Sequence, residues 1–266
     1  MRAMVAPVVY FQWALFALLF LSQAALVAIF LARKSWRAYP AFFSYILLNL
    51  VQGGALFAIY RSRGFSSDLA QYFGWASQGA IILARALAIA ELCRHLLARY
   101  SGIWALTKRL IFVCGVALAL YSVFAAGRRW DTGVLKADRG LELTIIVVIV
   151  VLFLCARNYG IAASPIIHAL ALGFCLNSAF WVLNDAILEQ KFAPYDALWN
   201  ILNALTYLAT LLLWIWTFRN PLPDAEVDPT LLPRDVYRVM APEVNVRLRL
   251  LNESLSKLYK AEARRS

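Results

Sequence analysis

The sequence has few of the residues that build catalytic sites. It contains only two histidines, His95 and His168, which are too few for the multi-histidine metal site of ceramidase-related intramembrane hydrolases. It also has no HExxH, GxSxG or Walker motif. We therefore expect a protein that is not an enzyme and that needs no metal and no cofactor.

Cysteine and lysine are also missing from the arrangements that would indicate a disulfide, a metal site or a bound retinal. The four cysteines lie inside apolar runs and none has CxxC spacing, so we interpret them as small apolar fillers rather than disulfides or metal ligands. The last apolar run, 194–218, has no lysine, which excludes a retinal linked there.

Charge is scarce as well. Charged residues make up 15% of the chain and hydrophobic residues 62%, with a mean hydropathy of +0.67. Soluble domains average about 25% charged residues, so this composition is typical of a membrane protein. The net charge of +11 lies largely in loops and in the tail. There it favours contact with anionic lipid headgroups, and we expect no nucleic-acid partner.

Seven apolar stretches are long enough for the ~20 residues of a crossing helix. We predict an all-α, seven-transmembrane helix bundle, integral to a bacterial cytoplasmic membrane and multi-pass. The predicted spans are 6–32, 40–60, 72–98, 104–126, 139–158, 164–187 and 194–218. The only sizeable loops expected are 94–109 and 127–140.

The distribution of basic residues predicts the orientation. Inner and outer loops carry equal numbers of Lys and Arg, but the first span has three basic residues after it and one before it. The tail adds more basic residues on the same side. Basic segments stay in the cytoplasm, which favours an N-out, C-in topology.

The chain changes character after Phe218. We divide it into a transmembrane domain (1–218), a proline-rich cytoplasmic linker (219–242) and an amphipathic cytoplasmic helix (243–266). In the last part Val244, Leu248, Leu251 and Leu255 recur at helical spacing. Helix 243–260 could lie on the membrane or on the chain's own loops; alternatively, it could dock a partner protein or a second copy, together with the basic inner loops.

A weak internal repeat relates the two ends of the membrane domain. Pro40 and Pro165 start matching spans, and an amide follows each proline twelve residues later, Gln52 and Asn177. A real duplication would give two parallel three-helix units joined by the fourth helix. This 3+1+3 plan resembles the architecture of the SWEET transporters, although none of their sequence motifs is present.

Several polar residues lie inside the predicted spans. Arg85 is near the middle of its span, where a charge costs roughly 3 kcal/mol and needs a partner. Polar side chains at helical spacing form stripes that should face inward, because lipid cannot satisfy their hydrogen bonds. We expect these residues to line an outward-facing polar pocket: Arg85, Gln78, Gln52, Asn177, Asn200, Asn203, Tyr207, Asp185, Asp196 and Glu142. The three carboxylates among them are candidate counter-ions for Arg85.

A second polar group lies at the other end of the Arg85 span. Glu91 precedes Arg94 and His95 by three and four residues, which places all three on one helix face. We interpret them as a local ion-pair cluster.

Two short motifs carry a family resemblance. Pro40-Ala41-Phe42-Phe43 begins the second span, and Glu91-Leu92-Cys93-Arg94-His95 ends the third. The chain resembles uncharacterised bacterial seven-helix integral membrane proteins that carry a PAFF-type start and an ExxRH-type end at these places. The resemblance implies no activity.

Three functions remain open. A receptor-like or sensory protein would bind a small ligand at Arg85, with an anion as one candidate, and would signal through its inner face. A small-solute carrier would use the 3+1+3 plan. An accessory subunit of a larger membrane complex would use its inward polarity only for packing. Span 72–98 contains no proline, and span 194–218 has one only at its first position, Pro194. The absence of a helix-breaking residue inside either span favours the receptor or the subunit over the carrier.

Overall fold

The computed structural model describes residues 2–64, 67–97, 101–126, 130–158, 163–189, 196–220 and 246–257. Within these ranges the regular structure is entirely helical, with seven long helices and a short 3-10 helix, η1 (Ser35–Arg37). The long helices are α1 (Arg2–Ala32), α2 (Pro40–Arg63), α3 (Asp68–Leu97), α4 (Ser101–Ala126), α5 (Trp130–Asn158), α6 (Pro165–Glu189) and α7 (Asp196–Arg219).

Both loops expected from the sequence are mostly helical, so that prediction was wrong. The range 94–109 contains the end of α3 and the beginning of α4, and the range 127–140 contains the first turns of α5. Charge-rich stretches end a membrane span, but they do not end a helix. Leu135, Lys136 and Ala137 are good helix formers, and the polar residue that follows, Asp138, finds a partner inside the bundle.

Turn residues mark the ends of α1 and α2. Lys34, with φ 57°, adopts the left-handed conformation that stops α1 before η1. Pro40 occupies the first turn of α2, where its missing N–H group costs nothing. Gly64, with φ 83°, ends α2 in a backbone conformation that side chains rarely adopt.

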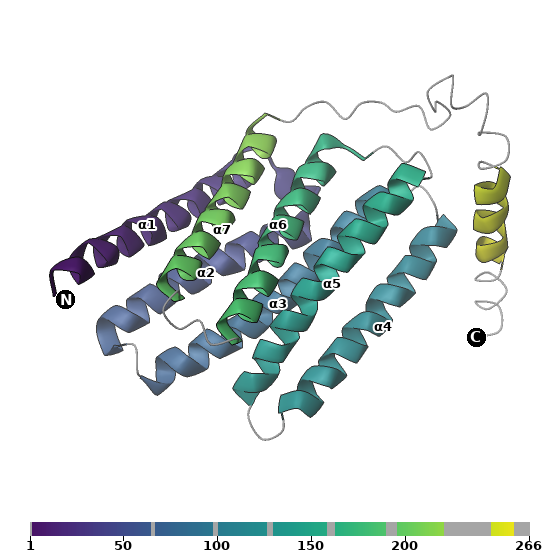
Figure 1. The fold of residues 1–266 in the computed structure, drawn as a ribbon. Helices are drawn as coiled ribbons and strands as arrows, with labels where there is room; N and C mark the ends of the chain where they lie inside the picture. Colours follow the sequence, from purple (N-terminus) through teal and green to yellow (C-terminus); the bar gives the residue numbers. More distant parts are fainter. Residues whose placement is uncertain are drawn as a thin grey trace.

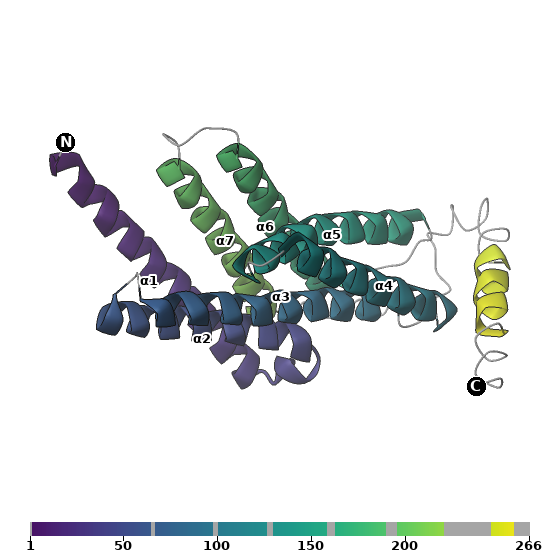
Figure 2. The same ribbon diagram turned by 90° about the horizontal axis from the view of Figure 1, so that it is seen from below.

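Six of the long helices form a closed ring. Each neighbour contacts the next in the order α1, α2, α3, α5, α6, α7, and α7 returns to α1. α4 lies outside this ring, where it packs mainly on α5 and also touches α3 (Figure 1). Figure 2 shows the same arrangement from below, with α2 and α3 in one layer and α6 and α7 in another.

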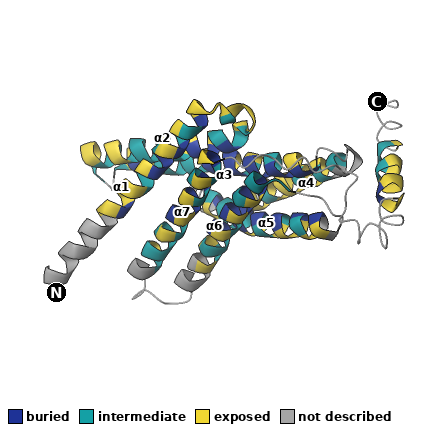
Figure 3. Ribbon diagram, turned by 90° about the horizontal axis from the view of Figure 1, so that it is seen from above, coloured by how far each residue is buried: buried dark blue, intermediate teal, exposed yellow. Residues whose placement is uncertain are grey.

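The outer surface of the ring and α4 is apolar. Figure 3 shows exposed positions along the outward sides of the helices and buried positions toward the interior. Large apolar side chains are among the exposed residues, with Phe112 at 71% and Phe124 at 82% on α4 alone. Contiguous exposed apolar surface of this kind indicates contact with lipid.

Five of the described helices are long and apolar enough to cross a membrane. They are Trp13–Ala32, Pro40–Arg63, Thr107–Phe124, Pro165–Leu183 and Trp199–Arg219. The chain is therefore an all-helical, polytopic membrane protein. The other two predicted spans lie in α3 and α5, which carry more charged residues and do not meet this criterion.

An aromatic cluster fills one end of the ring, where α2 and α6 begin and α7 ends. Phe30 packs on Phe218 with ring centroids 4.3 Å apart, and Phe42 packs on Trp214 at 4.9 Å. Phe174 of α6 completes the cluster, 5.2 Å from Trp214. We call these five residues the aromatic layer. Such ring pairs contribute about 0.5–1.5 kcal/mol each beyond their burial, so they stabilise this end of the ring.

The tail is described only in part. Residues 246–257 form a helix inside the predicted amphipathic segment 243–266, with Leu248 buried and Val246 and Leu250 exposed. The predicted linker 219–242 lies outside the described residues beyond position 220.

Candidate functional site

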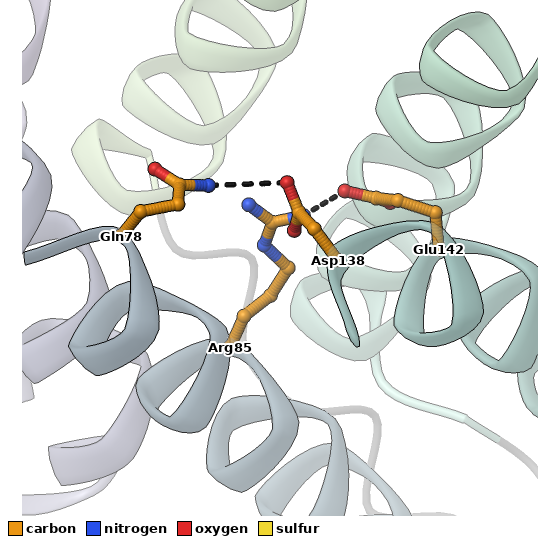
Figure 4. A network of polar contacts seen from close by, with 4 residues as sticks. All are labelled: Gln78, Arg85, Asp138 and Glu142. Atoms are coloured by element: carbon orange, nitrogen blue, oxygen red, sulfur yellow. Dashed lines mark hydrogen bonds and ion pairs between the residues drawn. The ribbon is translucent and has the colours of Figure 1, made fainter. Parts of the chain in front are cut away.

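Arg85 lies in the interior of the ring, with only 6% of its surface exposed. Its guanidinium forms ion pairs with two carboxylates of α5, Asp138 at 3.5 Å and Glu142 (Figure 4). Glu142 is 3% exposed. A buried charge of this kind persists only when it is paired, so the contact between α3 and α5 is built around these three side chains.

The two carboxylates share one face of α5 because they are four residues apart. The Gln78 amide, two turns before Arg85 on α3, donates a hydrogen bond of 3.1 Å to Asp138 Oδ2. Figure 4 shows Gln78 and Arg85 reaching from α3 toward Asp138 and Glu142. Gln78 thus holds one carboxylate while Arg85 contacts both.

The network continues into three more helices. The Arg85 guanidinium carbon lies 5.7 Å from the ring centroid of Tyr45 on α2, within cation–π range. The Tyr45 side chain also contacts Tyr207 of α7. Gln23 of α1 donates a hydrogen bond of 3.1 Å to the Tyr207 hydroxyl. A continuous run of polar contacts therefore crosses the ring from α1 through α7, α2 and α3 to α5.

This polar network lies directly beside the aromatic layer. Gln23 is seven residues before Phe30, Tyr45 is three after Phe42, and Tyr207 is seven before Trp214. At 1.5 Å per residue these offsets are about 5–10 Å along the ring axis, always in the same direction. We call this part of the ring the polar layer. It comprises the residues of the network and the polar side chains of α6 and α7 within about one turn of the same depth.

Contacts between helices show which residues of α6 reach the polar layer. Trp214 of α7 donates a hydrogen bond of 3.2 Å to the Ala169 carbonyl of α6, and the Phe153 ring of α5 packs on His168 at 5.0 Å. α6 runs antiparallel to both α7 and α5. Counting forward along α6 and backward along its two neighbours from these contacts places Asn177 and Ser178 within one turn of the depth of Tyr207 and Glu142.

The polar layer contains buried oxygen atoms that have no hydrogen-bond partner within the described residues. They are Glu142 Oε2, Asn177 Oδ1, Ser178 Oγ and Oδ1 of Asn203, which lies four residues before Tyr207 on α7. Arg85 Nε is a buried donor in the same condition. Buried polar groups without partners cost about 1–3 kcal/mol each. Native proteins keep few of them without a reason, so this layer is the candidate functional site.

Of the four other pocket residues predicted from the sequence, the structure places two away from the polar layer and does not describe the side chains of the other two. Gln52 donates to Ser77 Oγ of α3 at 2.8 Å and thereby links α2 to α3. Asn200 is exposed, so it does not face the interior of the ring. The side chains of Asp185 and Asp196 lie outside the described residues.

Glu91 has different partners from those expected. Its two carboxylate oxygens accept the backbone N–H groups of Ala41 and Phe42 at 3.2 and 3.0 Å, where it caps the start of α2. The His95 ring donates from Nε2 to the Ala38 carbonyl at 3.0 Å, and Arg94 is exposed. In the described structure these residues join α3 to the turn before α2, in place of the predicted local ion-pair cluster.

Sequence reasoning did not identify four members of the polar layer as site residues: Asp138, Tyr45, Gln23 and Ser178. Asp138 was assigned to a loop, although its spacing of four residues from Glu142 was a usable signal. Ser178 adjoins Asn177, and nothing in the sequence distinguishes it from serines that bond to their own helix.

Comparisons with models of known protein families, with curated proteins and with solved structures find no match for this chain.

Proposed function

We propose that the protein binds a small polar molecule inside the helix ring, at the polar layer, as a receptor-like or sensory membrane protein. The observation that carries this proposal is the set of buried, unpartnered oxygen atoms of the polar layer, one of which belongs to Glu142, an ion-pair partner of Arg85. A ligand that donated hydrogen bonds to these oxygens would offset the cost of burying them without partners.

The proposal includes a topology. All seven long helices cross the membrane, with the N-terminus outside and the tail in the cytoplasm. The aromatic layer then lies toward the cytoplasm and the polar layer toward the outside. The ion pairs of Arg85 support the crossing of α3 and α5, because paired charges that face the ring are tolerated in a membrane interior.

A binding screen tests the proposal. The purified protein in lipid nanodiscs is heated with a library of small anions, neutral polyols and amines, and its melting is followed. At least one compound should raise Tm in the wild type and in the control Gln71→Ala, which changes an exposed residue of α3. The same compound should have a smaller effect on Asn177→Ala. If no compound distinguishes Asn177→Ala from the control, the polar layer is not a binding site.

The order of helix contacts favours a second candidate, a small-solute carrier. The contacts α1–α2, α2–α3 and α1–α7 have counterparts in α5–α6, α6–α7 and α5–α3, while α4 stands outside the ring. This is the pattern that two parallel three-helix repeats joined by a linker helix would produce. Two polar links join the halves in the same related way, Gln23 of α1 to Tyr207 of α7 and Glu142 of α5 to Arg85 of α3.

Flux measurements separate the two functions. A compound found in the binding screen is offered to proteoliposomes that contain the wild type or Arg85→Ala. A carrier accumulates it in the wild type and loses this uptake in the variant. Binding without any uptake would exclude the carrier and leave the receptor-like function.

A further inference from the structure

We propose that the polar layer selects an organic ammonium ion that carries N–H donors, in preference to an anion. This inference rests on the proposed binding function and adds the chemical class of the ligand. Its starting point is that Arg85, the one cation of the network, is already contacted by carboxylates of the same chain.

The state of Arg85 argues against an anionic ligand. An anion could approach the guanidinium only beside Asp138 and Glu142, whose negative charges would repel it. Gln78, a second donor near this point, is already used by Asp138. Arg85 Nε is the one unpartnered donor described in the layer, against four unpartnered acceptor oxygens. A mid-membrane arginine normally suggests an anion site, but here its charge is neutralised inside the ring.

The unpartnered oxygens argue for a donor. The Asn177 side chain is 4% exposed and Ser178 is 1% exposed, so water has little access to either. Asn177 Oδ1, Asn203 Oδ1 and Glu142 Oε2 can only accept hydrogen bonds, and the Ser178 hydroxyl can accept one as well. Four acceptors on α5, α6 and α7 are thus available to a ligand with several donors.

The oxygen of Glu142 favours a charged donor over a neutral one. It belongs to an acid whose other oxygen contacts Arg85. An N⁺–H donor to a carboxylate oxygen makes a charge-assisted hydrogen bond, roughly twice as strong as a neutral one. An ammonium group with two or three N–H bonds can donate to Glu142 Oε2 and still have N–H groups left for other acceptors of the polar layer.

Four small probes that differ in charge and in N–H donors test the class. Ethanolamine carries the ammonium with N–H donors, choline carries the charge without N–H donors, ethylene glycol is the neutral analogue, and glycolate is the anion. Each is titrated against the full-length protein in nanodiscs while Tm is recorded. Ethanolamine should raise Tm of the wild type, and the other three should raise it less or not at all.

Two variants locate the effect. Ser178→Ala removes a hydroxyl that has no partner, so the ligand-free protein should melt at or above the wild-type temperature. Its apparent Kd for ethanolamine should nevertheless be about tenfold weaker, the loss expected for a hydrogen bond to a charged group. Ser122→Ala is the matched control, since Ser122 is a buried serine of α4 that bonds to the Leu118 carbonyl of its own helix.

The second variant, Glu142→Gln, keeps the shape of the side chain and removes its charge. It should abolish the preference for ethanolamine over ethylene glycol, whether or not it lowers the stability of the ligand-free protein. Choline acting as well as ethanolamine, glycolate acting better, or no effect of Ser178→Ala on the ethanolamine Kd would each overturn the inference.

Failure of the inference and failure of the proposed function give different results. If a library compound of another class raises Tm in an Asn177-dependent way while ethanolamine does not, the site exists and the ammonium assignment is wrong. If no compound of any class gives an Asn177-dependent shift, the proposed binding function itself fails.

Discussion

Arg85 shows how one residue organises the interior of the ring. Its guanidinium contacts carboxylates of α5 and the ring of Tyr45 on α2, so the side chain joins three helices at one point. Removing one member of a buried ion pair leaves an uncompensated charge. The cost then exceeds the value of the contact itself.

Replacement of Arg85 should therefore be strongly destabilising. Arg85→Met leaves Asp138 and Glu142 buried without their cation, and we expect a loss of about 3–5 kcal/mol in the free energy of unfolding. Thermal or denaturant unfolding in detergent measures this loss. Arg85→Met combined with Glu142→Met should be more stable than Arg85→Met alone. The exposed Arg61, changed to Met, serves as the control and should have little effect.

A second prediction at this scale concerns Glu91. Its carboxylate accepts two of the N–H groups that the start of α2 leaves open, and it comes from another helix. Glu91→Ala should cost about 1–2 kcal/mol of stability, the range seen for lost helix caps. Glu91→Gln keeps one acceptor oxygen and should cost less. Equal stability of the wild type and Glu91→Ala would show that the cap contributes nothing.

At the scale of elements, α6 and α7 pack closely at Gly173. A methyl group at this position would overlap the Trp214 indole and the Thr210 side chain. Trp214 cannot move away easily, because it belongs to the aromatic layer and donates a hydrogen bond to Ala169. The absence of a side chain at Gly173 is therefore what lets the two helices pack here.

Gly173→Ala should thus lower the free energy of unfolding by about 1–3 kcal/mol, as overpacking does in other cores. Gly79→Ala on α3 is the matched control, since a methyl group there would meet nothing within 4 Å. The two variants are compared by thermal unfolding in the same detergent. A Gly173→Ala protein as stable as Gly79→Ala would contradict the close packing of α6 on α7.

At the scale of the whole molecule, the prediction that can be tested directly is the topology. Ser62, near the end of α2, and Ser254, in the tail helix, are both exposed. With the N-terminus outside, a membrane-impermeant maleimide should label Ser62→Cys in intact cells. Ser254→Cys should be labelled only after the membrane is opened. The reverse pattern would invert the proposed orientation, and the wild type reports any labelling of the native cysteines.

The sequence by itself determined the helical class, the membrane character and the approximate length of the helices. Long apolar runs separated by basic residues leave the backbone no alternative in lipid but to form helices. It also pointed to Arg85 and Glu142, because a charge inside an apolar run is visible without a structure. The ends of the helices were harder to predict from the sequence. α5 shows the reason, because a polar stretch can continue a helix when its side chains find partners.

The tertiary structure alone decided which polar residues meet. Asp138 and Glu142 lie more than fifty positions from Arg85, and Tyr207 lies 184 positions from Gln23. Helical periodicity gives the face of the helix on which a side chain lies. Which other helix packs against that face depends on the order of the helices in the ring. The ring places α3 beside α5 and leaves α4 outside. Arg85 is thereby paired with two carboxylates of the chain itself.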